Sequence, residues 1–120
     1  MSLPLTVGVI GLGSMGMGAA KSLLAADIKT FGLDMNPDAL ASFKAAGGTV
    51  ANTPAEMAEQ VDILIVFVVN AAQVESVLFG DGGAAAALSP GAVVVQCATI
   101  PAAASRDIAS RLTPLKVMMI

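Results

Sequence analysis

The stretch Val7-Gly8-Val9-Ile10-Gly11-Leu12-Gly13-Ser14-Met15-Gly16 decides the fold of this 120-residue chain. A short apolar run ends in Gly-x-Gly-x-x-Gly, and small residues with helical character follow at once over residues 17–26. This order is typical of a strand, a tight turn and the start of a helix. It predicts that Gly11 permits the turn, that Gly13 allows a close approach to the backbone, and that Gly16 brings the helix close to the sheet.

The start of that helix is predicted to bind an anion. The N–H groups of a helix's first turn have no partners within the helix, and the helix dipole adds positive charge. Together with the preceding turn they fit the diphosphate of a dinucleotide cofactor. The expected contacts come from six residues, which we call the glycine-rich turn: Gly11, Leu12, Gly13, Ser14, Met15 and Gly16. Because the chain has 12 glycines, the same spacing can also arise in a turn without a ligand.

A second strand, expected over residues 28–34, ends in an acid. Asp34 lies 23 positions after Gly11, close to the ~20-residue spacing of a carboxylate that binds the ribose of adenosine. A carboxylate there repels a 2′-phosphate, and no arginine follows it, so we expect NAD in preference to NADP. Met35, next to Asp34, is included among the expected cofactor contacts. FAD and S-adenosylmethionine stay open as ligands of a similar turn.

Composition sets limits on the partners. Apolar residues make up 56% of the chain and charged residues 12%, which predicts that part of the surface is covered by a second domain or subunit. Abundant alanine accounts for part of this excess. The net charge of −3 and the small number of aromatic residues, four phenylalanines, argue against nucleic-acid binding. The single cysteine, Cys97, excludes an internal disulfide and a cysteine-rich metal site, and we expect no metal.

Two long uncharged segments, residues 1–20 and 82–105, raise the question of a membrane. The first lacks a basic start and is rich in glycine, and prolines interrupt the second, so neither fits a spanning helix. We therefore expect a cytoplasmic protein with no membrane partner. Residues 1–3 are interpreted as including residues added to the natural chain.

Strand and helix patterns alternate along the chain. Strands are expected over residues 6–10, 28–34, 49–51, 63–68, 92–96 and 115–120, and helical segments over 14–26, 37–46, 54–60, 71–79, 84–88 and 101–112. Short connections between them need right-handed crossovers, which predicts one α/β domain over residues 1–120. Its doubly wound, Rossmann-like parallel sheet should have six strands in the order 3-2-1-4-5-6. On the first helix, Met15, Ala19 and Leu23 are expected to pack on the sheet.

The ends of the fourth and fifth strands are expected to face the nicotinamide half of the cofactor. The candidates are Val68, Val69 and Asn70 after the fourth strand, and Thr99 after the fifth. Asn70 is alternatively an ordinary loop or capping residue, and Thr99 alternatively caps the next helix. Cys97 is expected to be a small buried hydrophobe without a nucleophilic role, because no base, helix terminus or cation is placed to activate it.

No residue is convincing as a catalytic acid or base. Hydride transfer to or from an alcohol needs a proton donor or acceptor on the oxygen, usually Lys, His or Tyr. Histidine and tyrosine are absent, and the lysines have the context of solvated surface charges: Lys21, Lys29, Lys44 and Lys116. We therefore expect no catalytic residue in this chain.

The glycine-rich turn, with Ala19 and Leu23, resembles the amino-terminal signature of the β-hydroxyacid dehydrogenases, which include the 3-hydroxyisobutyrate dehydrogenases and tartronate semialdehyde reductases. The run Val68-Val69-Asn70-Ala71-Ala72-Gln73-Val74, with Val77-Leu78-Phe79-Gly80, is most similar to the L-threonate dehydrogenase branch. The resemblance covers the whole chain. It implies an NAD-binding domain followed by an all-helical domain that carries a catalytic lysine, completes a homodimer and acts on a small hydroxy acid.

The resemblance also implies roles for single residues. The family's acid after the second strand matches Asp34, and its threonine after the fifth strand matches Thr99. Cys97 and Ala98 stand where relatives usually carry hydroxyl residues. The family's Asp-x-Pro-x-Ser-Gly-Gly segment and its lysine would lie beyond Ile120, which implies a truncated enzyme that binds NAD(H) without turnover. A freestanding NAD-sensing or regulatory module is the alternative.

Overall fold

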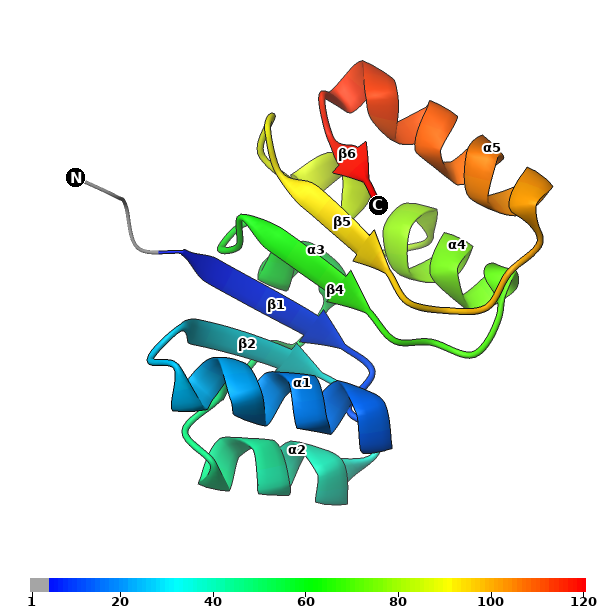
Figure 1. Cartoon of the computed structure of the whole chain (residues 1–120). Helices are drawn as coiled ribbons and strands as arrows, with labels where there is room; N and C mark the ends of the chain where they lie inside the picture. The colour runs from blue at the N-terminus through cyan, green and yellow to red at the C-terminus, as the bar shows by residue number, and fades with distance from the viewer. Residues whose placement is uncertain (1–4) are drawn as a thin grey trace.

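The computed structural model describes residues 5–120 and confirms the doubly wound α/β architecture (Figure 1). Six parallel strands form one sheet in the order β3-β2-β1-β4-β5-β6, as expected. The strands are β1 Thr6–Ile10, β2 Lys29–Leu33, β3 Thr49–Val50, β4 Ile63–Val66, β5 Val93–Gln96 and β6 Met118–Met119. The interpretation of residues 1–3 as added residues lies outside the described part of the chain.

Local sequence sets the starts of several helices. The α-helices are α1 Ser14–Ala25, α2 Pro37–Ala45, α3 Pro54–Ala58, α4 Ala71–Phe79 and α5 Ala102–Leu112, with 3₁₀ turns η1 Ala85–Ala87 and η2 Thr113–Leu115. Asn36 Oδ1 accepts the N–H of Asp38 at 2.9 Å, and Thr53 Oγ1 accepts the N–H of Glu56 at 3.1 Å. In both helices a proline follows the cap, where its missing N–H costs no hydrogen bond.

Every strand except β1 is shorter than its sequence pattern predicted, by one residue in β3 and β5, two in β2 and β4, and four in β6, and two cases have a clear physical reason. β4 ends at Val66 instead of Val68, because β1 turns away at Gly11 and leaves the residues after Phe67 without a neighbouring strand. β6 covers only Met118–Met119, because the 3₁₀ turn at Thr113–Leu115 is followed by Lys116 in the left-handed region, with φ of 60°. In both places the tertiary neighbours, and not β propensity, set the strand's limits.

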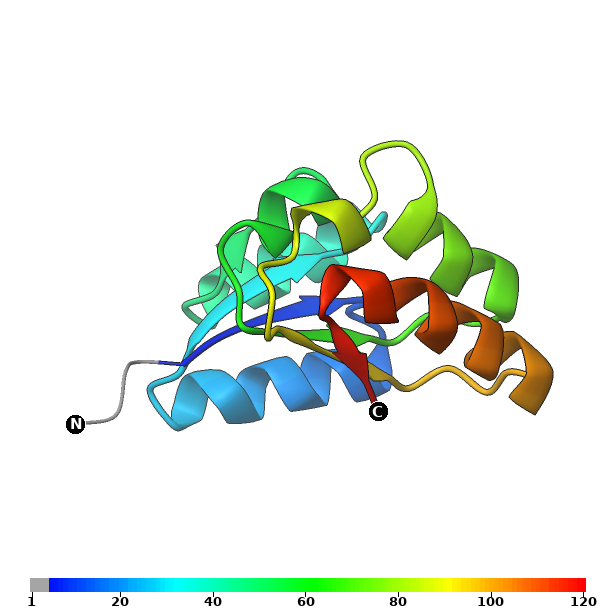
Figure 2. The same cartoon turned by 90° about the horizontal axis from the view of Figure 1, so that it is seen from above.

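The sheet separates two apolar cores, and Figure 2 shows α1 and α4 on its opposite sides. On the α1 side, Val9 packs with Ala20 of α1 and Phe43 of α2. The larger core on the other side joins the sheet to α3, α4 and α5. The core positions there include Ile10, Met57, Leu64, Val66, Val74, Leu78, Ile108 and Leu112. This arrangement sends α1 and α4 away from the sheet on different sides, at the strand ends where the site lies.

The face of α1 that meets the sheet differs from the expected stripe. Met15 was expected to pack on the sheet, but it is 75% exposed. The buried positions are Gly16 and Ala20. A Cβ at Gly16 would lie 1.8 Å from the carbonyl oxygen of Gly11, so the helix begins in contact with the glycine-rich turn itself. Close packing at the first turn therefore puts Gly16 in place of Met15, whereas Leu23 packs against the core on this side as expected.

Half of the sheet's α1 face has no helix over it among the described residues. Val7 and Val9 of β1 are buried on this face, where Val9 packs with Ala20 of α1. Their neighbours in register continue the same apolar surface toward the edge of the sheet: Ile63, Ile65, Val93, Val95 and Met118. These side chains belong to neither core, and Met118 is 66% exposed. Parallel sheets are normally covered on both faces, so the apolar excess of the composition gathers here.

None of the helices within residues 5–120 has the length and apolar character needed to cross a membrane.

Candidate functional site

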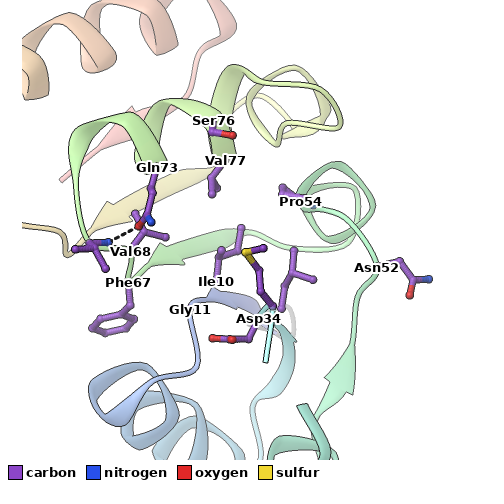
Figure 3. A pocket seen from close by; sticks show the side chains of 13 residues that line it. Ile10, Gly11, Asp34, Asn52, Pro54, Phe67, Val68, Gln73, Ser76 and Val77 are labelled. Carbon is purple, nitrogen blue, oxygen red and sulfur yellow. Dashed lines mark hydrogen bonds between the residues drawn. The ribbon is translucent and has the colours of Figure 1, made fainter. Parts of the chain in front are cut away.

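A cleft lies where β1 and β4 part at their carboxyl ends (Figure 3). β1 continues into α1 on one face of the sheet and β4 into α4 on the other, which leaves a crevice at the point where the strand order reverses. This main cleft has a volume of about 620 Å³. Its lining comes from four strand ends, from the start of α3 and from α4: Ile10, Gly11, Leu33, Asp34, Met35, Asn52, Pro54, Phe67, Val68, Val69, Gln73, Ser76 and Val77.

The glycines of the turn meet different geometrical requirements. Gly11 has φ of 94°, and a Cβ there would lie 1.9 Å from the carbonyl oxygen of Phe67. Glycine at this position therefore permits both the positive φ of the turn and the close approach of β1 to the end of β4. A Cβ on Gly13 would meet no described atom within 4 Å. Gly13 thus faces open space, where a ligand could come close to the backbone.

The start of α1 has backbone donors that no described side chain caps. Gly13 is the N-cap residue, and no acidic residue occupies the first turn. The first intrahelical bond runs from the N–H of Met17 to the oxygen of Gly13, at 2.7 Å. In contrast, side chains cap α2, α3 and α4, although α5, which follows Pro101, also starts without one. The uncapped first turn of α1 fits an anion.

A smaller hollow of about 190 Å³ lies at this helix start. We call it the turn hollow, and its lining is Gly13, Ser14, Met15, Gly16, Phe67, Val68, Val69 and Cys97. It shares Phe67, Val68 and Val69 with the main cleft, so the two spaces adjoin. An extended ligand could therefore run from the main cleft past the glycine-rich turn into the turn hollow.

Asp34 stands at the border between the turn and the main cleft (Figure 3). Its side chain is half-buried, and its two oxygens accept backbone bonds from Leu12 N–H at 2.6 Å and Asn36 N–H at 2.8 Å. A carboxylate has further lone pairs that can accept sugar hydroxyls. Among the described residues that line the main cleft, Asp34 is the only one with an ionisable side chain.

The loop after β4 is fixed to α4 by one glutamine. The side-chain oxygen Oε1 of Gln73 accepts the N–H of Val69 at 2.7 Å, the bond drawn from Gln73 in Figure 3. The backbone N–H of Gln73 donates to Asn70 Oδ1 at 2.9 Å. Asn70 is therefore the N-cap of α4, and it lines neither the main cleft nor the turn hollow. Val68 and Val69, held by these bonds, line both.

Thr99 is also absent from both linings within the described chain. The alternative that it caps the next helix is wrong, because α5 begins after Pro101 without a side-chain cap. Met35 is fully exposed at the edge of the main cleft, which it lines, whereas Leu12 is buried and lines neither space. The structure thus gathers most of the expected contacts around two connected spaces and leaves Leu12, Asn70 and Thr99 outside their linings.

Sequence reasoning missed part of the lining. Asn52 follows β3, and the carboxyl end of that strand lies at the same edge of the sheet, so its position was available as a signal. Gln73, Ser76 and Val77 come from one face of α4. Predicting them requires knowing which face of α4 looks over the strand ends.

Cys97 is exposed, so the expectation of a buried residue was wrong. Its N–H donates to the oxygen of Val66 at 2.9 Å just beyond β5, which places the residue at the mouth of the turn hollow. Partial burial raises the pKa of the Cys97 thiol above its ordinary value, because desolvation disfavours the thiolate. The thiol is accordingly not activated for nucleophilic chemistry.

We expect iodoacetamide to alkylate Cys97 more slowly than the cysteine of a short, uncharged, unstructured peptide at neutral pH. The raised pKa lowers the thiolate fraction at every pH below it, so the rate should rise with pH and reach its midpoint above that of the free thiol. Mass spectrometry of the single cysteine gives the rate. A midpoint below that of the peptide cysteine would contradict the raised pKa.

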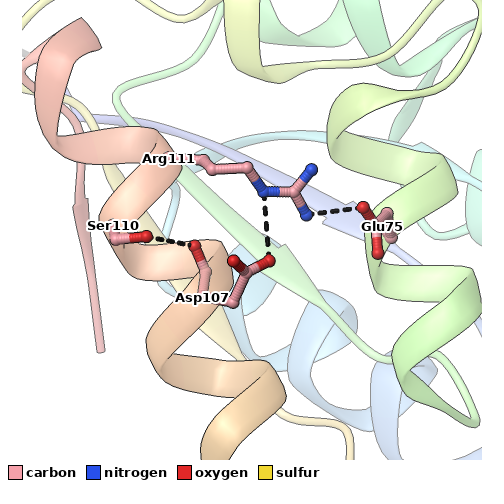
Figure 4. Close-up of polar contacts among 4 residues, drawn as sticks. All are labelled: Glu75, Asp107, Ser110 and Arg111. Atoms are coloured by element: carbon pink, nitrogen blue, oxygen red, sulfur yellow. Dashed lines mark hydrogen bonds and ion pairs between the residues drawn. The ribbon is translucent and has the colours of Figure 1, made fainter.

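Arg111 of α5 forms ion pairs away from the site, within α5 and across to α4 (Figure 4). Arg111 Nη2 lies 2.6 Å from Glu75 Oε1, and Arg111 Nε lies 3.3 Å from Asp107 Oδ2. Its guanidinium also stacks 4.1 Å from the ring centroid of Phe79. These groups are partly exposed, so each pair contributes little to stability. The network orients α5 against α4 and is not part of either cleft lining.

Comparison with known proteins gives consistent matches. The family described as "NAD binding domain of 6-phosphogluconate dehydrogenase" matches residues 6–120. L-threonate dehydrogenase of Escherichia coli (strain K12) is 47% identical over 115 residues, which cover 95% of this chain and 38% of the relative. L-threonate dehydrogenase of Cupriavidus necator is 43% identical over 114 residues, with the same two coverages.

A solved structure agrees with these sequence matches. The crystal structure of 3-hydroxyisobutyrate dehydrogenase from Salmonella typhimurium superposes with a TM-score of 0.91 at 46% identity. The match covers 96% of this chain and 40% of that one. The chain therefore spans less than half the length of the relatives it matches, over their NAD-binding portion.

Proposed function

Because this chain belongs to the NAD-binding domains of the 6-phosphogluconate and β-hydroxyacid dehydrogenases, we propose that it binds NAD(H) across the glycine-rich turn and Asp34. In this proposal it is the cofactor domain of an oxidoreductase that transfers a hydride between NAD and a small hydroxy acid. The observation that carries the proposal is the carboxylate of Asp34 beside an uncapped helix start, at the point where the strand order reverses.

The residues have distinct roles in this binding mode. The backbone of the glycine-rich turn holds the diphosphate, and Asp34 accepts the hydroxyls of the adenosine ribose. Met35 flanks the adenosine side, and Val68 and Val69 exclude water on the nicotinamide side. Asn70 and Thr99 remain proposed contacts of the nicotinamide half, which they would meet from loops next to the turn hollow. When bound, NAD supplies the hydride acceptor, and the residues of this chain bind and orient it.

NAD is preferred over NADP in this proposal. The carboxylate of Asp34 would face the 2′-phosphate of NADP, and no lysine or arginine is present in the described lining of the main cleft to offset it. Calorimetric titration of the chain with NAD and with NADP is the test. We expect NAD to bind at least about tenfold more tightly, a difference of about 1.4 kcal/mol. Equal affinities would contradict the assignment of Asp34 to the ribose.

The hydroxy-acid substrate is proposed from the relatives. Those with the highest identities reported above are described as L-threonate dehydrogenase and 3-hydroxyisobutyrate dehydrogenase. Both names describe the oxidation of a small hydroxy acid. We propose L-threonate or a similar sugar acid as the substrate of the whole enzyme.

A second domain completes the enzyme in this proposal and supplies a catalytic lysine. Neither described lining contains a histidine, tyrosine or lysine that could exchange a proton with an alcohol. The uncovered apolar half of the sheet, with Met118 and Ile120 exposed, supports further structure next to β6. A homodimer of the whole protein is part of the same proposal.

We therefore expect the 120-residue chain to bind NAD without turning over L-threonate or 3-hydroxyisobutyrate. The measurement is the absorbance of NADH formed from each acid and NAD, with calorimetry confirming that NAD is bound under the same conditions. Formation of NADH above the rate without protein would refute this expectation, because it would require a proton acceptor within these 120 residues.

A freestanding NAD-sensing module is the second candidate, and it is favoured by the described linings, which contain no histidine, tyrosine or lysine. The two candidates differ in what the gene encodes. A reading frame that continues past the codon for Ile120 into a glycine-rich segment and a helical lysine motif supports the enzyme. A stop codon at that point supports the module.

A further inference from the structure

We propose that Asp34 has a second role, as the positioning residue that holds the glycine-rich turn in its receptive shape before any ligand arrives. The inference rests on the proposed function, in which the same carboxylate accepts the ribose hydroxyls. It adds that ribose recognition and the shape of the diphosphate cradle depend on one side chain.

The contacts of the carboxylate join two turns. Oδ2 accepts the N–H of Leu12 at 2.6 Å, in the middle of the glycine-rich turn. Oδ1 accepts the N–H of Asn36 at 2.8 Å, at the start of α2. Asp34 thus links two loops that are far apart in sequence: the loop after β1 and the loop after β2.

The backbone at Leu12 has no strand to pair with. Gly11, the first residue after β1, donates its N–H to the oxygen of Leu33, the last residue of β2, at 2.9 Å. One residue later the chain has left β1, and the Leu12 side chain is buried with only 3% of its surface exposed. The Asp34 carboxylate supplies the acceptor for the Leu12 N–H, in a charge-assisted bond. Without it, this N–H would lose its acceptor beside the core.

The two residues beside Leu12 restrain the turn through their backbones alone. Gly11 and Gly13 have no side chains to pack, and glycine has the largest conformational freedom of any residue. The side chain of Leu12 anchors the turn on one side, and the bond from Asp34 fixes the direction of its N–H. A ligand that contacts only the turn should therefore still depend on Asp34.

Asp34→Asn tests this dependence, since it keeps the shape of the side chain. An amide offers one acceptor oxygen, whereas the carboxylate uses two, so a donor NH₂ must face either Leu12 N–H or Asn36 N–H. Asp81→Asn is the matched control, because it removes the same charge from an exposed turn outside both linings.

The first readout is amide hydrogen exchange of the ligand-free chain by NMR. We expect Asp34→Asn to increase exchange at Leu12 by about tenfold relative to Val9 in β1, and Asp81→Asn to leave that ratio unchanged. Normalising to Val9 separates a local loosening of the turn from a loss of global stability. An unchanged ratio in Asp34→Asn would overturn the positioning role.

The second readout is the affinity for nicotinamide mononucleotide, which has a phosphate but no adenosine ribose. We expect Asp34→Asn to weaken both this mononucleotide and NAD. If only NAD binding weakens, Asp34 is a ribose ligand alone and the inference fails while the proposed function stands. If the wild-type chain binds neither ligand but Leu12 exchange rises in Asp34→Asn, the proposed function fails and the positioning role stands.

Discussion

Gly16→Ala is expected to lower the free energy of unfolding by about 3 kcal/mol or more, or to prevent folding. The new Cβ would lie 1.8 Å from the carbonyl oxygen of Gly11 and 2.9 Å from its carbonyl carbon. Both atoms belong to the backbone of the turn, so no side-chain rotation relieves the clash. The helix and the glycine-rich turn would have to separate, and α1 would lose its contact with the sheet.

Gly18→Ala is the matched control, two residues further along the same helix. A Cβ at Gly18 would meet no described atom within 4 Å outside the helix's own backbone. Alanine is the better helix former, so this variant should gain up to about 1 kcal/mol. Urea unfolding followed by circular dichroism measures both, because the chain has no tryptophan or tyrosine for fluorescence. Equal unfolding midpoints for the two variants would contradict the tight helix–turn contact.

Gly13→Ala should fold like the wild type and bind NAD about tenfold to a hundredfold more weakly, a loss of about 1.4–2.8 kcal/mol. Gly13 has φ of −71° and ψ of −167°, a conformation that alanine adopts without strain. The methyl group would occupy the open space in front of the turn, where the proposed diphosphate lies.

Calorimetric titration with NAD and urea unfolding together check this variant. Gly18→Ala again serves as the control, since it lies in α1 outside both linings and should bind NAD like the wild type. Unchanged NAD affinity in Gly13→Ala would mean that the diphosphate does not approach this part of the backbone. A change in stability as large as that of Gly16→Ala would mean that Gly13 is structural.

Sequence predicted the elements whose limits are set locally. The bounds of β1 and α4 match the expected 6–10 and 71–79, and the caps that begin α2 and α3, at Asn36 and Thr53, bond N–H groups only two or three residues away. These features depend on alternation, proline and short polar side chains within a few residues. The strand order also followed, because alternating strands and helices allow few right-handed arrangements.

Features that depend on distant neighbours were not predictable in the same way. β4 stops at Val66 because β1 turns away, and Met15 is exposed because Gly16 occupies the contact with the turn. The exposure of Cys97 depends on where β5 ends relative to β4. No local pattern contains this information.

The same distinction between local and distant determinants applies to the residues of the candidate site. The glycine-rich turn and Asp34 were recognisable because their spacing reflects one strand–helix–strand unit. Gln73 and Asn52 were missed, because their place in the lining depends on how α4 and β3 sit at the edge of the sheet. The bond from Asp34 to Leu12 N–H also depends on tertiary structure, since it joins two connections 22 residues apart.

A crystal structure of this chain with NAD tests most directly whether the glycine-rich turn and Asp34 hold one dinucleotide. We predict the diphosphate against the backbone N–H groups at the start of α1 and the adenosine ribose hydroxyls on the Asp34 carboxylate. NAD bound elsewhere, with the glycine-rich turn free of any ligand, would contradict the proposed site.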